Sequence, residues 1–274
     1  MTAAFALGPA LLFCPADRPD RYATALERAD AVILDLEDAV EPSRRAEARK
    51  EVVRSRLDPD RVIVRVNPAT SPDHSADVDA LARSHYRYAM LAKAESRADL
   101  ELLSPWPTIA LCETAAGVLA AAEIASTPAV VALMWGAEDL VVSLGGTSSR
   151  TGDGAYRDVV RHARSAVALA AAAHGVGMID TVHLDIDDAD GLAAEAADAA
   201  ALGFVATACI HPAQVGIIRD AYRPSVDEIE RARELLAAAE GMTGAFRFRG
   251  TMVDAPVLRH AHTVVHRAGT PTIR

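Results

Sequence analysis

Eight short apolar runs alternate with segments of helical pattern along the chain, and this alternation limits the possible folds more than any other feature. Runs rich in Val, Ile, Leu and Ala that end at turn residues are typical of strands buried on both faces of a parallel sheet. The predicted strands are 11–15, 31–36, 62–66, 88–92, two that begin at 108 and 130, 178–184 and 206–210. Eight strands with intervening helices predict a (β/α)8 TIM barrel rather than a doubly wound open sheet.

The C-terminal part of the chain exceeds what such a barrel needs. The chain has 274 residues, whereas a barrel of this type takes roughly 250. We assign residues 1–221 to a catalytic barrel and residues 222–274 to a C-terminal helical extension or lid. The extension contains a charged amphipathic helix at 225–240, a short extended turn and one more helix. Because no linker separates the two parts, the sequence predicts that the extension belongs to the same domain.

Charge and composition exclude several classes of partner. The formal net charge of −10 argues against nucleic acid and against an anionic membrane surface as partners, although it does not exclude a small anionic substrate. No segment approaches the roughly 18 to 20 apolar residues of a membrane span. The apolar N-terminus has no basic residue before Arg18, so it is interpreted as a lead into the first strand. Cys14, Cys112 and Cys209 lack CxxC spacing, which indicates reduced core residues of a cytoplasmic protein.

Polar residues follow most of the predicted strands. The active site of a (β/α)8 barrel lies at the carboxyl ends of its strands, so these residues are candidates for catalysis or binding. The candidates are Asp35, Glu37, Arg65, Lys93, Glu113, Asp139, Asp185 and His211. No GxGxxG or GxxxxGKS motif follows a strand, so the phosphate cradle of a nucleotide-binding fold is missing.

Glu113 and Asp139 end two consecutive apolar runs and could lie side by side. A buried carboxylate is costly unless it has a partner of opposite charge. Mg²⁺ is held in proteins by one or two carboxylates together with water or substrate oxygens. The pair therefore predicts a Mg²⁺ site, and the alternative is that both are solvated loop acids.

Two cations occur among these acids. Arg65 lies inside an apolar strand, where a guanidinium needs a carboxylate partner. That partner is either a substrate carboxylate or an internal one, Asp35 or Glu37. The partner of Lys93 is likewise either a bound ligand or an internal carboxylate, Glu37.

Three further segments could bind ligands, but each has a simpler explanation. The Asp17-Arg18 pair follows the first strand, and residues 145–150 (GGTSSR) precede a helix, whose free N–H groups favour phosphate. Exposed arginines and Gly-Ser loops are nevertheless common. His262 and His266 could share a helix face with His260 nearby, but without further ligands a solvated helix is the better interpretation.

The motifs at these positions resemble one known family. FCPADRPDR, VILDLEDAV, VIVRVN, LAKAES, CETAAG, WGAEDL, CIHPAQV and GTMVDAPV occur in this order between Leu11 and Arg267. Together they resemble the HpcH/HpaI aldolase family, and within it the citrate lyase beta subunit-like proteins. The chain departs from the pattern at Ala92, where many relatives have proline before the lysine.

The resemblance implies a Mg²⁺-dependent lyase that cleaves or forms a carbon–carbon bond in a 3-hydroxyacyl thioester such as citryl-, citramalyl- or malyl-CoA. The products would be acetyl-CoA and a 2-oxo acid such as oxaloacetate, pyruvate or glyoxylate. Mg²⁺ would be held by Glu113 and Asp139, and Arg65 would hold the carboxylate of the oxo acid. Because the resemblance requires no Schiff base, Lys93 is assigned to hydrogen bonding.

The resemblance also implies roles for residues elsewhere in the chain. Asp254, in the segment MVDAP, would move a proton at the acetyl carbon and would reach the site of a neighbouring subunit in a homo-oligomer, a trimer or hexamer. Glu37 is placed with Asp254 and Arg65 among the catalytic residues. The substrate-binding set implied is Asp35, Arg18, Arg65, Lys93, Gly136 and Ala137.

Other functions remain compatible with the same residues. A synthase running in the condensing direction and a thioesterase would use the same site. An acyl-carrier-protein-dependent subunit of a citrate lyase complex would use a different form of the thioester. A ligand-binding paralogue without catalysis is the third alternative, and Glu113, Asp139, Arg65 and Asp254 argue against it.

Overall fold

The computed structural model describes residues 5–269 of the chain. The chain divides into two compact units on either side of the bond between Ile218 and Arg219. Each unit is described by itself below. The prediction that the C-terminal extension shares a domain with the barrel therefore stays a prediction.

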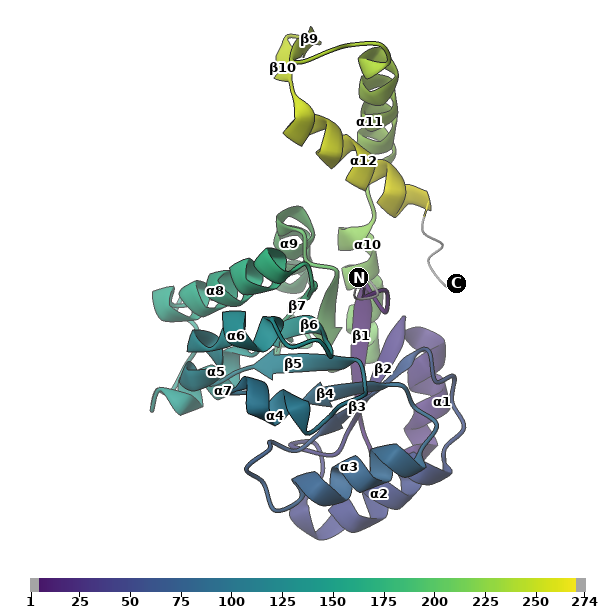
Figure 1. The fold of residues 1–274 in the computed structure, drawn as a ribbon, viewed down its shortest axis with the longest axis vertical. Coiled ribbons are helices and arrows are strands. Elements are labelled where there is room, and N and C mark those ends of the chain that lie inside the picture. Colours follow the sequence, from purple (N-terminus) through teal and green to yellow (C-terminus); the bar gives the residue numbers. More distant parts are fainter. Residues whose placement is uncertain (1–4, 270–274) are drawn as a thin grey trace. The chain divides into compact units, whose positions relative to one another are not determined.

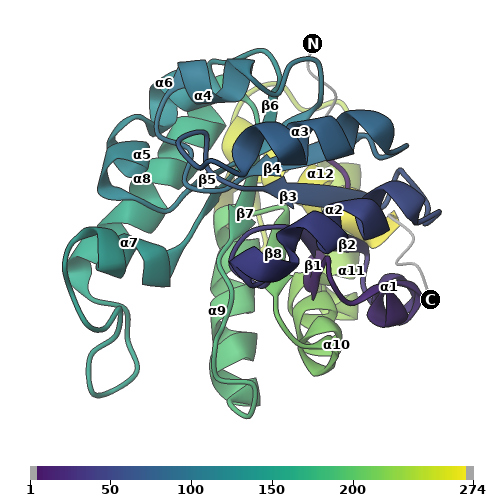
Figure 2. The same ribbon diagram turned by 90° about the horizontal axis from the view of Figure 1, so that it is seen from below.

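The first unit is a closed barrel of eight parallel strands in sequence order, which confirms the predicted (β/α)8 TIM barrel. Figures 1 and 2 show its helices on the outside of the strands. The strands are β1 (Ala10–Pro15), β2 (Ala31–Asp35), β3 (Val62–Val66), β4 (Tyr88–Leu91), β5 (Thr108–Cys112), β6 (Val130–Trp135), β7 (Gly177–Asp180) and β8 (Ala206–Cys209).

Helices follow every strand, and β2 is also followed by a short 3₁₀ turn, η1 (Pro42–Arg44). The helices of the barrel are α1 (Pro19–Arg28), α2 (Arg45–Arg54), α3 (His74–Arg83), α4 (Arg97–Glu101), α5 (Ala115–Leu119), α6 (Ala121–Ala125), α7 (Ala137–Ser143), α8 (Asp158–His174) and α9 (Ala189–Leu202). Helix α10 (Pro212–Tyr222) follows β8 and continues past the division between the units.

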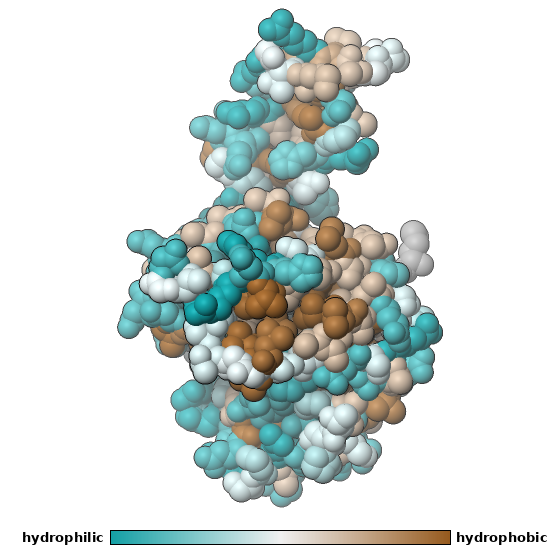
Figure 3. Space-filling model, turned by 90° about the vertical axis from the view of Figure 1, so that its left-hand side faces the viewer, coloured by the Kyte–Doolittle hydropathy of each residue, from teal (hydrophilic) through white to brown (hydrophobic). Residues whose placement is uncertain are grey.

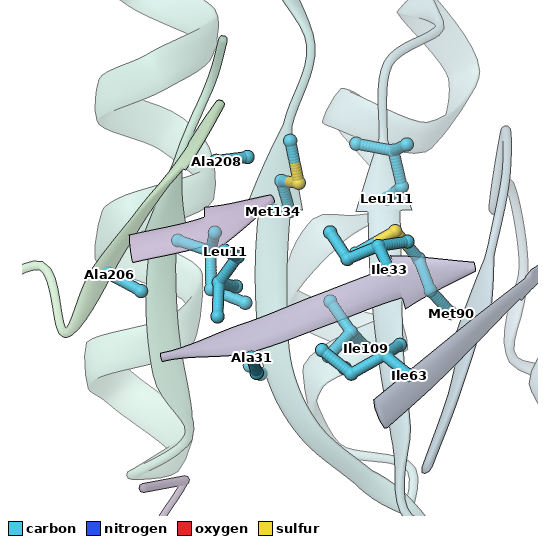
Figure 4. Packing of buried hydrophobic residues seen from close by; sticks show 12 residues of the cluster. Leu11, Ala31, Ile33, Ile63, Met90, Ile109, Leu111, Met134, Ala206 and Ala208 are labelled. Atoms are coloured by element: carbon cyan, nitrogen blue, oxygen red, sulfur yellow. The ribbon is translucent and has the colours of Figure 1, made fainter. Parts of the chain in front are cut away.

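The barrel interior is filled by side chains from the strands. Every residue of β2, β3, β5 and β6 is buried, as expected for strands that are covered on both faces. Figure 4 shows Leu11, Ile33, Ile63, Ile109 and Met134 among the side chains that pack together there. The centre of the barrel is therefore a packed core, and chemistry is confined to its ends.

The predicted strand 178–184 is too long, because β7 ends at Asp180. Its ladder with β8 ends at the pair Asp180 and Thr207. Thr181 and His183 remain buried, with the half-buried Val182 between them, so the segment keeps the alternating burial of a strand. However, the carbonyl oxygen of His183 accepts its hydrogen bond from the Gln214 side chain (2.8 Å). A buried loop with a side-chain partner therefore imitates a strand in the sequence.

The second unit contains two helices and a hairpin. Helix α11 (Val226–Ala239) starts at a capping box of Ser225 and Glu228. Strands β9 (Phe246–Phe248) and β10 (Thr251–Val253) pair antiparallel, and helix α12 (Ala255–Gly269) follows. Their turn is Arg249-Gly250, and both residues have positive φ (47° and 86°), as two-residue hairpin turns require. The predicted order of helix, extended turn and helix agrees with these elements.

Apolar side chains are exposed on one side of the barrel. Figure 3 shows hydrophobic residues gathered on the side that carries α5 to α8. Exposed apolar side chains of these helices include Leu119 on α5, Val142 on α7 and Leu169 on α8. Within residues 5–269, no helix is both long and apolar enough to cross a membrane.

Candidate active site

A buried ion pair joins the carboxyl ends of β2 and β3. Asp35 lies opposite Arg65 in the register of these two strands. Arg65 donates from Nε and Nη2 to the two carboxylate oxygens of Asp35, both at 2.6 Å. Burial by itself lowers the pKa of Arg65, but Asp35 and then Glu37 outweigh it and hold that pKa above its usual range. The ion pair of Arg65 with an internal carboxylate, one of the two predicted alternatives, is thus present in the structure. It fixes the guanidinium at the barrel mouth.

Glu37 connects this pair to Lys93. One Glu37 carboxylate oxygen lies 3.0 Å from Arg65 Nη1, and the other accepts a hydrogen bond from Lys93 Nζ at 2.5 Å. Glu37 is buried, and its pKa is raised because burial outweighs the opposing effect of Arg65 and Lys93. The predicted pairing of Lys93 with Glu37 is therefore present as well.

Glu113 follows β5 directly and is 3% exposed. Its Oε1 accepts a hydrogen bond from the backbone N–H of Lys93 (3.0 Å). Its pKa is raised to about 8, first by burial and then by the negative charge of Asp139, against the opposing effect of Arg65 and Lys93. A carboxylate with such a pKa lacks enough positive charge around it.

Asp139 lies in the first turn of α7, a helix that the sequence analysis did not predict. Its side chain is 33% exposed, and Oδ1 lies 3.2 Å from Lys93 Nζ. The neighbouring Glu138 accepts a hydrogen bond from Ser149 Oγ (2.6 Å). The helix thus directs these two adjacent acids to different partners, and of the two Asp139 is the one that meets Lys93.

Gly136 allows β6 and α7 to pass close to Glu113. A Cβ on Gly136 would lie 2.8 Å from both Cβ and Oε2 of Glu113. Real Cβ atoms do not approach other atoms this closely, so a glycine is needed here. Ala137 begins α7 and is buried. These two predicted substrate-binding residues therefore lie at the same point of the mouth as Glu113.

Negative charge exceeds positive charge in this cluster. Lys93 Nζ also lies 3.2 Å from Asp38, an acid that the sequence analysis did not single out. The ionisable groups of the cluster are five carboxylates and two cations: Asp35, Glu37, Asp38, Glu113 and Asp139 with Arg65 and Lys93. A divalent cation bound here would balance the excess negative charge of these carboxylates.

The donor set at Glu113 and Asp139 fits Mg²⁺. Both carboxylates converge on one cation, since Lys93 Nζ lies 3.9 Å from Glu113 and 3.2 Å from Asp139. Hard carboxylate oxygens are the ligands that Mg²⁺ prefers, and two of them leave other positions for water or substrate. Within the described residues, no group of three or more His, Cys, Asp or Glu side chains is arranged to hold a metal.

Other candidates from the sequence lie elsewhere. Arg18 precedes α1 and pairs with Asp20 (3.0 Å). Asp185 does not end a strand, because β7 stops at Asp180, and it is exposed in the following loop. His211 is exposed two residues beyond β8, where its Nδ1 accepts the N–H of Ala213 (3.2 Å). The acid that actually ends β7 is Asp180, which binds Trp135 Nε1 (2.6 Å).

The glycine-rich segment 145–150 does not directly precede a helix. Helix α8 begins only at Asp158, with Arg157 as its N-cap. Arg150 instead pairs with Glu195 (2.6 Å) and lies over the ring of Tyr156 at 3.9 Å. This segment thus lacks the helix N-terminus that would favour phosphate.

Asp254 and the C-terminal histidines belong to the second unit. Asp254 lies between β10 and α12, where its Oδ1 accepts the N–H of Val257 (3.4 Å). His260, His262 and His266 all lie on α12. The predicted catalytic role of Asp254 depends on a contact between units, so it stays a prediction.

Comparison with known proteins places these motifs in a family. Residues 10–212 match the model of the HpcH/HpaI aldolase/citrate lyase family. A citrate lyase subunit beta-like protein of Mycobacterium tuberculosis is 53% identical over 97% of this chain and 98% of its own length. The mitochondrial citramalyl-CoA lyase of Homo sapiens is 31% identical over 86% of this chain and 78% of its own length. The (3S)-malyl-CoA thioesterase of Cereibacter sphaeroides is 34% identical, over 91% of this chain and 90% of its own.

Solved structures give the same result. The structure of CitE from M. tuberculosis with magnesium, acetoacetate and coenzyme A matches with a TM-score of 0.93 and 53% identity, over 97% of this chain and 99% of that one. A citrate lyase beta subunit from M. tuberculosis with oxaloacetate and magnesium matches with a TM-score of 0.79 and 54% identity, over 80% of this chain and 98% of that one.

Proposed function

This chain belongs to the HpcH/HpaI aldolase/citrate lyase family, and from that we propose that it is a Mg²⁺-dependent carbon–carbon lyase. Its substrate class would be 3-hydroxyacyl thioesters such as citryl-, citramalyl- or malyl-CoA. Cleavage would give acetyl-CoA and a 2-oxo acid such as oxaloacetate, pyruvate or glyoxylate. The observation that carries the proposal is the convergence of Glu113 and Asp139 beside Arg65 and Lys93 at the barrel mouth.

In this proposal Glu113 and Asp139 hold Mg²⁺, which when bound acts as a Lewis acid on the oxygen that gains charge as the carbon–carbon bond breaks. Arg65 orients the carboxylate of the oxo acid. Its guanidinium has five N–H groups, of which Asp35 takes two and Glu37 approaches a third nitrogen, so donors remain for a ligand. Asp35 and Glu37 keep this guanidinium in place, and the region of Gly136 and Ala137 forms the adjacent wall.

Proton transfer is assigned to Asp254. In cleavage the 3-hydroxyl group loses its proton to water and becomes the carbonyl group of the oxo acid. The bond between C2 and C3 breaks, and its electron pair stays on C2 as a thioester enolate, which takes a proton at that carbon. Asp254 would supply that proton, and in the condensing direction it would remove one. The assignment is supported by the resemblance to relatives that act on CoA esters, which carry an aspartate in the C-terminal segment that matches MVDAP here.

Coenzyme A is the favoured thioester carrier. A relative that is 53% identical to this chain was solved with coenzyme A, which supports CoA esters over an acyl carrier protein. Arg18, half-buried after β1, is the proposed contact for a CoA phosphate. We further propose a cytoplasmic homo-oligomer, a trimer or hexamer, and the exposed apolar side chains on α5, α7 and α8 support subunit contacts.

A thioesterase is the second candidate reaction. The (3S)-malyl-CoA thioesterase of C. sphaeroides is 34% identical to this chain, as close as the citramalyl-CoA lyase at 31%. The two reactions differ in their products. Lyase activity releases acetyl-CoA and an oxo acid, whereas hydrolysis releases free CoA and a hydroxy acid.

The test is product analysis with and without Mg²⁺. Purified protein is incubated with citramalyl-CoA, malyl-CoA and citryl-CoA, and acetyl-CoA, free CoA and oxo acid are quantified. We expect acetyl-CoA and oxo acid in equal amounts, and no turnover after chelation with EDTA. Free CoA as the main product would instead establish the thioesterase, and turnover that survives chelation would contradict the proposed Mg²⁺ site.

A further inference from the structure

Lys93 makes contact with four carboxylates at once. Its Nζ lies 2.5 Å from Glu37, 3.2 Å from Asp38, 3.9 Å from Glu113 and 3.2 Å from Asp139. These acids come from the segments after β2, β5 and β6. Two of them, Glu113 and Asp139, are the proposed Mg²⁺ ligands. The ammonium group therefore shares carboxylates with the metal.

The backbone at Lys93 is adapted to this position. Its φ is 49°, in the left-handed region that is strained for a residue with a side chain. A glycine would adopt this conformation without strain but would supply no ammonium group. The N–H of Lys93 donates to Glu113 Oε1 (3.0 Å), so backbone and side chain both contact carboxylates of the cluster.

The choice of lysine is unusual in this chain. Lys50 and Lys93 are its only lysines, and the other 26 of its 28 basic residues are arginines. A guanidinium is a planar fork that binds one carboxylate with two parallel hydrogen bonds, as Arg65 does with Asp35. An ammonium is compact and directs three donors to different acceptors. A compact ammonium group therefore suits the position of Lys93 Nζ among four carboxylates.

We infer that Lys93 is the internal counter-cation of this carboxylate cluster and that it competes with Mg²⁺ for Asp139. The inference rests on the proposed function in one respect, that Glu113 and Asp139 bind Mg²⁺. An oxygen of Asp139 that coordinates Mg²⁺ lies beside a divalent charge, which repels the ammonium. Glu37 and Asp38 remain as acceptors, so Lys93 withdraws toward them when Mg²⁺ binds.

Two consequences follow for the metal-free and the metal-bound protein. Without Mg²⁺, Lys93 keeps the side chains of Glu113 and Asp139 aligned. With Mg²⁺, its positive charge weakens metal binding, so the ion is held less tightly than two carboxylates alone would hold it. Lys93 is thus a positioning residue for the metal ligands.

The first test compares Mg²⁺ affinities by calorimetry on the intact protein. Lys93→Met removes the ammonium but keeps most of the aliphatic stem, and we expect it to tighten Mg²⁺ binding by about tenfold or more. Lys50→Met is the matched control, because it removes the same charge from a side chain that is 59% exposed and pairs with Glu47 on α2. Its Mg²⁺ affinity should equal that of the wild type.

The second test observes Lys93 without replacing it. Protein labelled with ¹³C at lysine Cε gives two side-chain signals, and Lys50→Arg identifies which one belongs to Lys93. We expect the Lys93 signal to shift on Mg²⁺ titration while the Lys50 signal stays in place.

The outcomes separate this inference from the proposed function. Equal Mg²⁺ affinity of wild type and Lys93→Met, or weaker binding by Lys93→Met, overturns the inference alone, as does a Lys93 signal that Mg²⁺ leaves unchanged. Absence of Mg²⁺ binding in both wild type and Lys93→Met overturns the inference and the proposed function together.

Discussion

Glu113 and Asp139 differ in burial, so their replacement should affect the protein differently. Glu113 is 3% exposed, whereas the Asp139 side chain is 33% exposed. We expect Glu113→Gln and Asp139→Asn each to weaken Mg²⁺ binding by about 100-fold or more, because each removes a unit charge beside a divalent ion. In the metal-free protein above pH 8, where Glu113 is ionised, Glu113→Gln should keep or raise the melting temperature, since it removes a buried charge without a full partner. Calorimetry and thermal unfolding measure the two effects.

Glu138→Gln provides the control at the adjacent position. Glu138 accepts a hydrogen bond from Ser149 and is one residue from Asp139. An amide oxygen can accept the same bond, so Mg²⁺ affinity should stay within about twofold of the wild type. If Glu138→Gln weakened Mg²⁺ binding as strongly as Asp139→Asn, the assignment of Asp139 as ligand would be wrong.

The pKa of Glu113 makes Mg²⁺ binding depend on pH. Burial and the charge of Asp139 raise the pKa of Glu113 to about 8, and Mg²⁺ binds the deprotonated carboxylate. Below pH 8 the metal must displace a proton, so affinity should rise about tenfold per pH unit up to about pH 8 and then level off. Calorimetry in buffers of different ionisation enthalpy should detect the released proton. A flat affinity between pH 6 and 8 would contradict the raised pKa.

The raised pKa of Glu113 also makes the free energy of unfolding depend on pH. The folded-state pKa of Glu113 is above the usual glutamate value of 4.5, so the folded protein binds the proton more tightly than the unfolded chain does. Its contribution to the free energy of unfolding is fully present below pH 4.5 and is lost as the pH rises to about 8. Asp139→Asn should move the upper end of this window to lower pH, because the Asp139 charge raises the pKa.

Individual site residues were predictable from their places after strands, but their partners were not. An acid after an apolar run indicates the mouth of a barrel, and this identifies Glu113 and Asp139. The pairing of Arg65 with Asp35 depends on the register of two strands that are 30 residues apart in the chain. Asp38 is one of several acids in its loop, and only the backbone of Lys93 brings an ammonium to it.

At the scale of elements, the strands were predicted better than the segments at their ends. Buried runs of Val, Ile and Leu identified all eight strands, because both faces of each strand are covered. Helix α7 was missed, since its start at Ala137 directly follows β6 and Gly136, and its N-cap Gly136 has no side chain to cap it. This helix decides which of two adjacent acids meets Lys93. The element that was hardest to predict therefore carries a proposed metal ligand.

Gly136 determines how closely α7 approaches Glu113. In Gly136→Ala the new Cβ would lie 2.8 Å from Cβ and Oε2 of Glu113, so either α7 or the carboxylate must move. We expect a loss of about 1–3 kcal/mol in the free energy of unfolding. Mg²⁺ affinity should fall as well, by about tenfold, because the two ligands lose their alignment. Urea unfolding and calorimetry measure these changes.

Gly216→Ala is the matched substitution in another helix. Gly216 lies inside α10, and a Cβ there meets no atom within 4 Å. Alanine favours a helix over glycine, so this variant should be as stable as the wild type or more stable by up to about 1 kcal/mol, with unchanged Mg²⁺ affinity. Equal behaviour of the two variants would show that the close approach at Gly136 has no functional role.

At the scale of the whole molecule, the sequence predicts the barrel but not the assembly. Alternating strands and helices within a chain of this length have few other closed arrangements. Assembly depends on surfaces such as the exposed Leu119, Val142 and Leu169, whose partners no sequence pattern specifies. The predicted role of Asp254 belongs to this scale, because Asp254 lies in the C-terminal unit and the proposed metal ligands lie in the barrel.

Asp254→Asn should separate binding from proton transfer. The amide keeps the size of the side chain and can still accept the N–H of Val257, so the fold should be unchanged. We expect Mg²⁺ and oxo-acid affinities equal to those of the wild type and a kcat lower by about 100-fold or more, the usual scale for loss of a general acid or base. Unchanged kcat would exclude Asp254 from proton transfer.

Mixed oligomers test whether Asp254 serves the site of a neighbouring subunit. Asp254→Asn subunits keep the metal ligands, and Glu113→Gln subunits keep Asp254, so each is inactive alone. If Asp254 acts in its own subunit, every subunit of a mixture carries one defect and activity stays absent. If it acts across subunits, an intact site forms where an Asp254→Asn subunit receives the aspartate of a Glu113→Gln neighbour. Random mixing in equal amounts should then restore about a quarter of the wild-type activity per site. The two variants are mixed, denatured and refolded together, and the activity of the mixture is compared with that of each variant refolded alone. Activity above this background supports the shared site, and activity equal to it contradicts the shared site.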